Sequence, residues 1–216
     1  LAEQIGGHGA YMIRWTSPID SWVEITGYVY RGTAGAISPR RVNWRLLKND
    51  SVFTQGAIPV DADGVTPLLG YDNRVGYADG LGGLRGTFVE VSQGDRIDLI
   101  TPGAPDFENG TPDWTNLKFT LTAEEASDVP TTRDVWDGRL GFVGGLDQTT
   151  SPNLPWTYHD ADGNLLIWNE DALGSGPAYA GDDGDGGALA PVVAGTARFG
   201  GQDPGSEQFG GHAPWM

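Results

Sequence analysis

Trp22-Val23-Glu24-Ile25-Thr26-Gly27-Tyr28-Val29-Tyr30 alternates aliphatic residues with polar or aromatic ones. Successive side chains of a β-strand point to opposite faces, so Val23, Ile25 and Val29 are expected to share one buried face. Trp22, Tyr28 and Tyr30 are then expected on the opposite, outward face, together with Glu24 and Thr26. A strand of this kind is typical of an antiparallel sheet with one buried face.

The same period of two returns in other segments of the chain, and turn residues such as Asn49-Asp50 and Ser92-Gln93-Gly94 separate them. These segments are 41–48, 51–54, 87–91, 95–100 and 117–121. The pattern predicts an all-β fold, an antiparallel β-sandwich with little helix and with Gly/Asp-rich loops. The long stretch from Asp61 to Gly86 is expected to carry a site or to pack as an ordered excursion.

Three parts are predicted along the chain. Residues 1–123 form the β-sandwich, and the polar residues 124–134 are a linker. Residues 135–216 are rich in Gly and Asp and hold only short apolar runs. We therefore expect this third part to pack on a sandwich, either its own or that of a neighbouring copy.

Composition excludes several classes of function. The 216 residues include 13 Lys and Arg against 29 Asp and Glu, a formal net charge of −16. This balance argues against nucleic acid as a partner, because contacts to phosphates need a basic surface. No apolar run approaches the length of a membrane span, so no membrane insertion is expected. The absence of Cys removes disulfides and thiolate chemistry.

The two ends of the chain carry an internal repeat. Glu3-Gln4-Ile5-Gly6-Gly7-His8-Gly9-Ala10-Tyr11-Met12 returns, at an offset of 204 residues, as Glu207-Gln208-Phe209-Gly210-Gly211-His212-Ala213-Pro214-Trp215-Met216. The chain is thus expected to be slightly more than one period of a tandem array, its third part beginning a second copy. Alternatively, the second segment replaces the first in a neighbouring molecule and makes a homopolymer. Both readings predict a repeat or assembly junction at Gly6, Gly7, His8, Gly210, Gly211 and His212.

Several segments resemble one group of bacterial domains. They are Met12-Ile13-Arg14-Trp15-Thr16-Ser17-Pro18, the strand 22–30, Asn43-Trp44-Arg45-Leu46-Leu47-Lys48-Asn49 and Val91-Ser92-Gln93-Gly94-Asp95-Arg96-Ile97-Asp98. Together they resemble extracellular jelly-roll domains of repetitive secreted or surface proteins, similar to carbohydrate-binding modules. The resemblance implies jelly-roll topology, an extracellular or cell-surface location and an adhesive or structural role. It implies no catalytic residue.

Aromatic residues suggest a glycan-binding face. Trp22, Tyr28 and Tyr30 on one strand, and Trp156 and Tyr158 in the third part, offer flat rings on which sugar rings can stack. Polysaccharide, or neighbouring repeat copies, would then be the partner. The alternative is that these rings pack inside the sandwich, where Trp and Tyr are common.

Two Asp-rich loops suggest calcium. Asp160-Ala161-Asp162-Gly163-Asn164 places oxygen ligands at alternate positions around a turn glycine, with Asp160, Asp162 and Asn164 as candidate ligands. Asp61-Ala62-Asp63-Gly64 is similar, with Asp61 and Asp63 as candidates. The alternative is that such Asp-Gly sequences are simply favourable turns.

Catalysis has little support in the sequence. The chain has three His and lacks the short motifs of metalloproteases, serine hydrolases and phosphate-binding loops. We predict a non-catalytic module of a tandem-repeat extracellular or surface protein, glycan-binding and stabilised by calcium. The alternatives are a purely structural subunit of a filament or surface layer, and a fragment of a polysaccharide-degrading enzyme.

Overall fold

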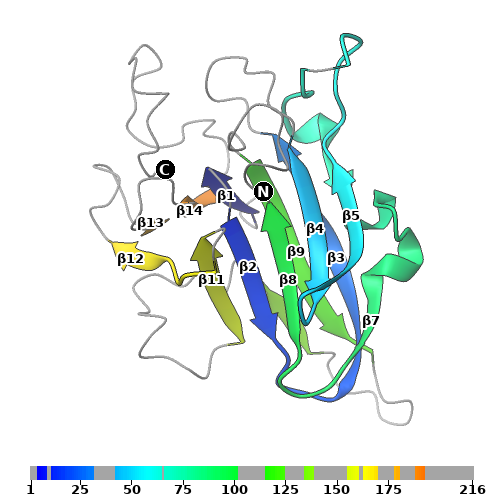
Figure 1. The fold of residues 1–216 in the computed structure, drawn as a ribbon, viewed down its shortest axis with the longest axis vertical. Helices are drawn as coiled ribbons and strands as arrows, with labels where there is room; N and C mark the ends of the chain where they lie inside the picture. Colours follow the sequence, from blue (N-terminus) through cyan, green and yellow to red (C-terminus); the bar gives the residue numbers. More distant parts are fainter. Residues whose placement is uncertain are drawn as a thin grey trace.

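A computed structural model describes residues 4–8, 11–31, 42–64, 66–101, 115–124, 134–138, 155–160, 163–169, 178–180 and 188–192. Within these ranges the chain forms two antiparallel sheets that pack face to face (Figure 1). The predicted all-β class is therefore confirmed. No helix in these ranges is long and apolar enough to cross a membrane.

The larger sheet contains strands from both ends of the chain. Its order is β12-β13-β14-β1-β9-β3-β6, with β10 also paired to β9 and β7 also paired to β3. The strands are β1 (Gln4–His8), β3 (Ser21–Arg31), β6 (Val75–Gly76), β7 (Phe88–Val91), β9 (Thr115–Ala123), β10 (Val135–Asp137), β12 (Ile167–Asn169), β13 (Ala178–Ala180) and β14 (Ala188–Val192). The long pair β3–β9 forms its centre, because the two strands stay in register from Val23 opposite Ala123 to Arg31 opposite Thr115.

The smaller sheet lies in front of the larger one in Figure 1 and has the order β11-β2-β8-β4-β5. Its strands are β2 (Tyr11–Thr16), β4 (Asn43–Lys48), β5 (Ser51–Ala57), β8 (Arg96–Thr101) and β11 (Trp156–Asp160). Asn49 and Asp50 both have positive φ, which closes the predicted turn between β4 and β5. Strands β10 and β11 of the third part thus pair with the two sheets of this sandwich.

A line of aromatic rings crosses the core between the sheets. Trp44 meets Tyr77 edge-on at 5.3 Å, Tyr77 meets Phe119 at 5.9 Å, and Phe119 meets Trp156 at 5.4 Å between ring centroids. Edge-to-face contacts of this kind are favoured by the ring quadrupoles. Trp44 belongs to β4, Tyr77 to the turn that follows β6, Phe119 to β9 and Trp156 to β11. The line of rings therefore joins separate parts of the chain in one core.

The stretch between β5 and β7 packs as an ordered excursion along one edge of the sandwich, which confirms one of the two expectations for it. It contains three short 3-10 turns, η1 (Tyr71–Asn73), η2 (Tyr77–Asp79) and η3 (Leu84–Thr87). Gly80 allows close packing here, because a Cβ at this position would lie 2.5 Å from the Trp44 ring. The excursion brings Tyr71 to β3 and Tyr77 into the core.

Candidate functional site

The outward face of the larger sheet carries aromatic residues at both ends and polar residues between them. It consists of Trp22, Glu24, Thr26, Tyr28 and Tyr30 on β3, Phe88 and Glu90 on β7, and Lys118, Thr120 and Thr122 on β9. Cross-strand pairing sets Glu90 beside Trp22 and Lys118 beside Tyr28. At about 3.3 Å per residue, Trp22 and Tyr28 stand roughly 20 Å apart. This outer face is our candidate functional site.

A tyrosine cluster, made of Tyr28, Tyr30 and Tyr71, forms one end of the outer face. The Tyr71 ring stands edge-on to Tyr28 at 5.4 Å and to Tyr30 at 5.6 Å between centroids. The Arg74 guanidinium lies 4.3 Å from the centre of the Tyr71 ring and 5.9 Å from that of Tyr28. Both distances are within the range of cation–π attraction.

Backbone contacts hold η1 against the end of β3. The Gly70 amide donates to the Arg31 carbonyl at 2.8 Å, and the Asn73 side-chain amide donates to the Leu69 carbonyl at 2.7 Å. Tyr71 and Arg74 are thereby fixed over Tyr28. The sequence did not place these two residues on the aromatic face, because they lie far from β3 in the chain. The pairing of β6 with β3 and the Gly70–Arg31 hydrogen bond bring them there.

The three aromatic residues predicted on β3 differ in how far their side chains are exposed. Trp22 is 47% exposed and Tyr28 is half-buried, so each offers surface to a ligand. Phe88 and Tyr71, which were not predicted, are also exposed. The Tyr30 ring is buried at 8% exposure, which corrects its expected place on an open strip. Tyr30 instead supports the edge of Tyr71.

The glycan-binding prediction is wrong for Trp156 and Tyr158. Pairing of β11 with β2 sets Trp156 beside Trp15 and Tyr158 beside Ile13, and all four side chains are buried in the core. The Tyr158 hydroxyl donates to the Gly138 carbonyl at 2.6 Å. A ring enclosed in this way has no face on which a sugar can stack. The alternative reading, core packing, holds for this pair.

The carboxylate of Asp160 takes part in a closed turn. Its Oδ1 accepts from the Asn164 backbone amide at 2.8 Å, and its Oδ2 accepts from the Asn164 side chain at 2.9 Å. Asp162, the third predicted ligand of this loop, lies outside the described residues. As placed, both oxygens of Asp160 already serve as acceptors within the turn.

The second acidic loop is also closed by local hydrogen bonds. Oδ1 of Asp61 accepts from the Ala62 amide at 2.6 Å, and the two oxygens of Asp63 accept from the amide and hydroxyl of Thr66 at 2.8 and 2.6 Å. Among the described residues no three His, Cys, Asp or Glu side chains gather as a metal site. These residues do not form a cation cage in the described ranges, and calcium stays a prediction.

The junction residues fall in two places. Gly6, Gly7 and His8 belong to β1, which pairs with β9 on one edge and β14 on the other. Gly210, Gly211 and His212 lie outside the described residues. Residues 6–8, the first copy of the repeated segment, therefore lie on an internal strand of the larger sheet.

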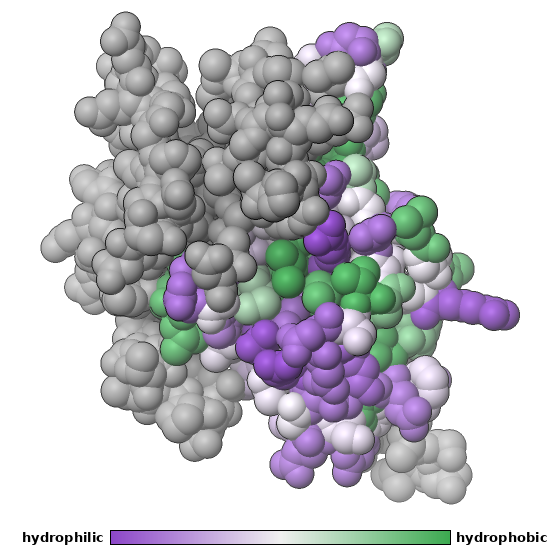
Figure 2. All heavy atoms as spheres, viewed as in Figure 1, coloured by the Kyte–Doolittle hydropathy of each residue, from purple (hydrophilic) through white to green (hydrophobic). Residues whose placement is uncertain are grey.

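The outer face of the smaller sheet, seen in Figure 2, carries hydrophilic groups with small hydrophobic areas among them. Asp98 is buried there, and both its oxygens accept from the Arg14 guanidinium at 2.8 Å. Arg96 pairs with the exposed Asp50 at 2.6 Å. Each of these charges is paired with an opposite charge on the same face, so the two ion pairs stabilise the fold and do not offer a charged site to a ligand.

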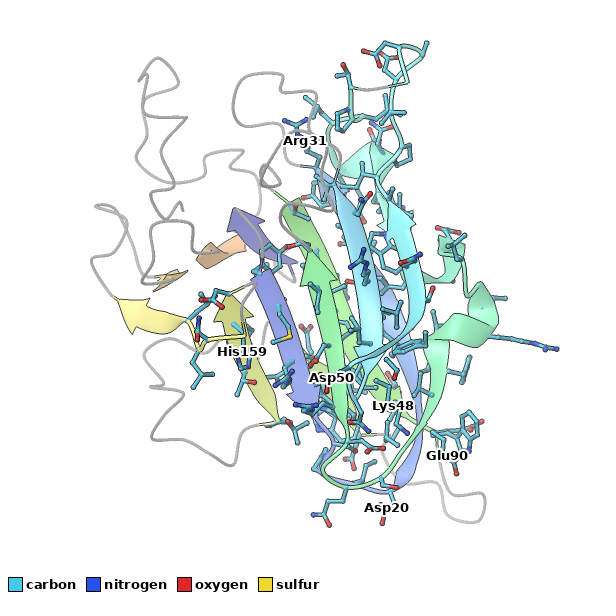
Figure 3. All side chains as sticks on the ribbon, in the orientation of Figure 1. Asp20, Arg31, Lys48, Asp50, Glu90 and His159 are labelled. Atoms are coloured by element: carbon cyan, nitrogen blue, oxygen red, sulfur yellow. The ribbon has the colours of Figure 1, made fainter. Side chains whose placement is uncertain are left out.

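His159 lies on the same side, at the edge strand β11 (Figure 3). Its Nδ1 donates to the Gly163 carbonyl at 3.0 Å, a tautomer required because a carbonyl can only accept, and Nε2 lies 2.8 Å from the Thr157 hydroxyl. Burial lowers the pKa of His159, an effect that the Gly163 carbonyl opposes and nearby Arg14 adds to. These contacts describe a neutral histidine that closes a loop.

Comparison with models of known protein families, with curated proteins and with solved structures gives no match.

Proposed function

We propose that this chain is a non-catalytic glycan-binding module and that the outer face of the larger sheet binds the sugar chain. The observation that carries the proposal is the tyrosine cluster with Arg74 above it, on the same face as exposed Trp22. Stacking of sugar C–H groups on aromatic rings would supply the apolar part of the contact, and the polar residues between the rings would bind hydroxyl groups.

The arrangement of the face suits an extended ligand. Glu24 and Thr26 lie between the two aromatic ends, and Thr122 lies opposite Glu24 on β9. Thr120, opposite Thr26, is buried and is not part of the binding surface. Arg74 has five N–H donors, of which one is donated to the Tyr71 carbonyl at 3.3 Å. The others can reach hydroxyl oxygens at the edge of the Tyr71 ring. A separation of roughly 20 Å between the aromatic ends corresponds to several sugar units, so we expect oligosaccharides to bind better than single sugars.

The wider role in this proposal follows from the resemblance and the repeat. It comprises a jelly-roll arrangement of the strands, a place in a tandem-repeat extracellular or cell-surface protein, and an adhesive or structural task with polysaccharide as partner. The repeat also favours a second candidate, a purely structural subunit of a filament or surface layer. A fragment of a polysaccharide-degrading enzyme is the third, and release of reducing ends during the binding assay would reveal it.

Retention on immobilised polysaccharides tests the proposal. We expect at least one polysaccharide of a panel to retain the chain, and expect Trp22→Ala and Tyr71→Ala each to weaken retention about tenfold. Leu81→Ala is the matched control, since Leu81 is 83% exposed and lies outside this face. Retention that survives both aromatic substitutions, or that Leu81→Ala weakens equally, would exclude the outer face as the binding site.

A further inference from the structure

Strand β1 occupies an internal position of the larger sheet. Ile5, Gly6 and Gly7 pair with Leu117, Asn116 and Thr115 of β9, and the other edge of β1 pairs with β14 along its whole length. In the described strand order, β14 is joined to β9 through β1 (Figure 1). The segment in this position therefore connects the strands β12 to β14 with the rest of the sheet.

Residues 207–216 repeat the sequence of β1 and the residues around it. Gly210 and Gly211 correspond to Gly6 and Gly7, and Phe209 corresponds to Ile5. The Ile5 side chain is buried in the core at 1% exposure, and the corresponding residue of the second copy, Phe209, is also apolar. Ladder hydrogen bonds use backbone groups alone, so the second segment can pair with β9 as β1 does.

The place of this segment in the chain also permits exchange. Residues 207–211 follow β14 after a connection of 14 residues, 193–206. This connection spans at most about 50 Å when extended, which is enough to reach another molecule of this size. In a second copy, a strand in the position of β1 lies between β9 and β14 and runs antiparallel to both.

We propose that the position of β1 is an exchange site, in which residues 207–211 of one copy of the chain pair with β9 of a second copy. These 216 residues hold this position and this segment once each, so head-to-tail exchange extends into an open assembly and reciprocal exchange between two copies closes as a dimer. The β1 strand of the same chain competes with an effective concentration in the millimolar range. Exchange therefore increases with protein concentration, and it does not depend on glycan binding.

Introduced cysteines test the contact directly, because the chain has none of its own. Gly6 faces Asn116 across the β1–β9 pair, so an exchanged Gly210 would face Asn116 of the other copy. We expect the full chain with Gly210→Cys and Asn116→Cys, oxidised at high concentration, to give covalent dimers or larger oligomers that reduction collapses. Peptide mapping should find the 210–116 disulfide between chains, a bond that Gly210→Cys alone cannot form. Gly6→Cys with Asn116→Cys is the matched control and should form its disulfide within one monomer. Gly210→Cys alone should give dimers at most.

Two outcomes of this experiment overturn the proposal. A disulfide between 210 and 116 within a monomer would mean that the segment fills the position in its own chain. A failure of these two positions to crosslink, while the control pair does, would mean that the segment does not pair with β9.

Light scattering of the full chain provides a second test, without cysteines. We expect the mean mass to rise with concentration, to rise further in Ile5→Ala, which weakens the resident strand, and to fall to the monomer in Phe209→Asp. Phe199→Asp, outside the repeat, is the control and should keep the mass of the unaltered chain. Equal masses in all four proteins would refute exchange.

Discussion

The ring of Tyr77 lies against Gly27 of β3, at a place where no side chain fits. A Cβ at Gly27 would stand 2.9 Å from Cε2 of Tyr77 and 1.9 Å from the carbonyl oxygen of Lys118. The Tyr77 hydroxyl donates to that same carbonyl at 2.8 Å. Gly27 therefore lets Tyr77 bridge the two sheets, directly beneath the strand that carries Tyr28 outward.

We predict that Gly27→Ala strongly destabilises the fold. The φ of Gly27 is +135°, which side chains rarely adopt, and the added methyl overlaps the Lys118 carbonyl. Strain and overpacking together predict a loss of about 3 kcal/mol or more. Gly94→Ala is the matched control, since Gly94 has φ +90° but open space around it, and about 1 kcal/mol is expected. Urea denaturation measures both, and equal losses would contradict the steric role of Tyr77.

The faces of β3 could be predicted from the sequence because alternation is a local property of the strand. Val23, Ile25 and Val29 are buried and Trp22 is exposed, as the pattern predicted. The place of Tyr77 could not be predicted, since it depends on a glycine in one segment and an excursion in another. The gap that Gly27 leaves for it exists only after the two segments pack.

The ion pair of Arg14 and Asp98 is predicted to contribute to stability. Asp98 is almost fully buried and Arg14 keeps 19% of its side chain exposed. Asp98→Asn leaves the guanidinium without its charged partner, and we expect a loss of about 2–3 kcal/mol, less than for a fully buried pair because water reaches Arg14.

The exposed pair of Arg96 and Asp50 provides the comparison for this prediction. Asp50 is 73% exposed, so Asp50→Asn should cost about 0.5 kcal/mol or less. Thermal or urea unfolding of the two variants side by side measures the difference. An Asp98→Asn protein as stable as Asp50→Asn would contradict the role given to burial.

Only part of the candidate site could be predicted from the sequence. Trp22 and Tyr28 lie on a strand whose faces are readable from its own residues. Trp156 and Tyr158 lie on a short strand, and which of its faces is buried depends on its pairing with β2, where they meet Trp15 and Ile13. Tyr71 and Arg74 were missed because their approach to β3 depends on the fold of the excursion.

Calcium is predicted to stabilise the fold through the loop that starts at Asp160. Binding to the folded state alone would raise the melting temperature, by about 3 °C at roughly ten times the dissociation constant, and a chelator should reverse the rise. The readout is the calcium-induced shift, because Asp160→Asn also disturbs the turn with Asn164. We expect Asp160→Asn to lose the calcium-induced shift and Asp72→Asn, at an exposed position outside both loops, to keep it. Asp61→Asn tests in the same way whether the second loop binds calcium. A melting temperature that changes with neither calcium nor chelator would exclude these sites.

The pH dependence of stability should report on His159. Because burial holds the folded pKa of His159 below its unfolded value of about 6.5, the unfolded chain binds the proton more readily. Stability is therefore full above that value and falls as the pH decreases through it toward the folded pKa. His159→Asn keeps a donor toward the Gly163 carbonyl and does not titrate, so its free energy of unfolding should change less between about pH 7.5 and pH 5.5. Carboxylates titrate mostly below this window, which leaves histidine as the main contributor within it. Parallel curves for the two proteins would mean that the buried ring takes up its proton as easily in the folded chain as in the unfolded one.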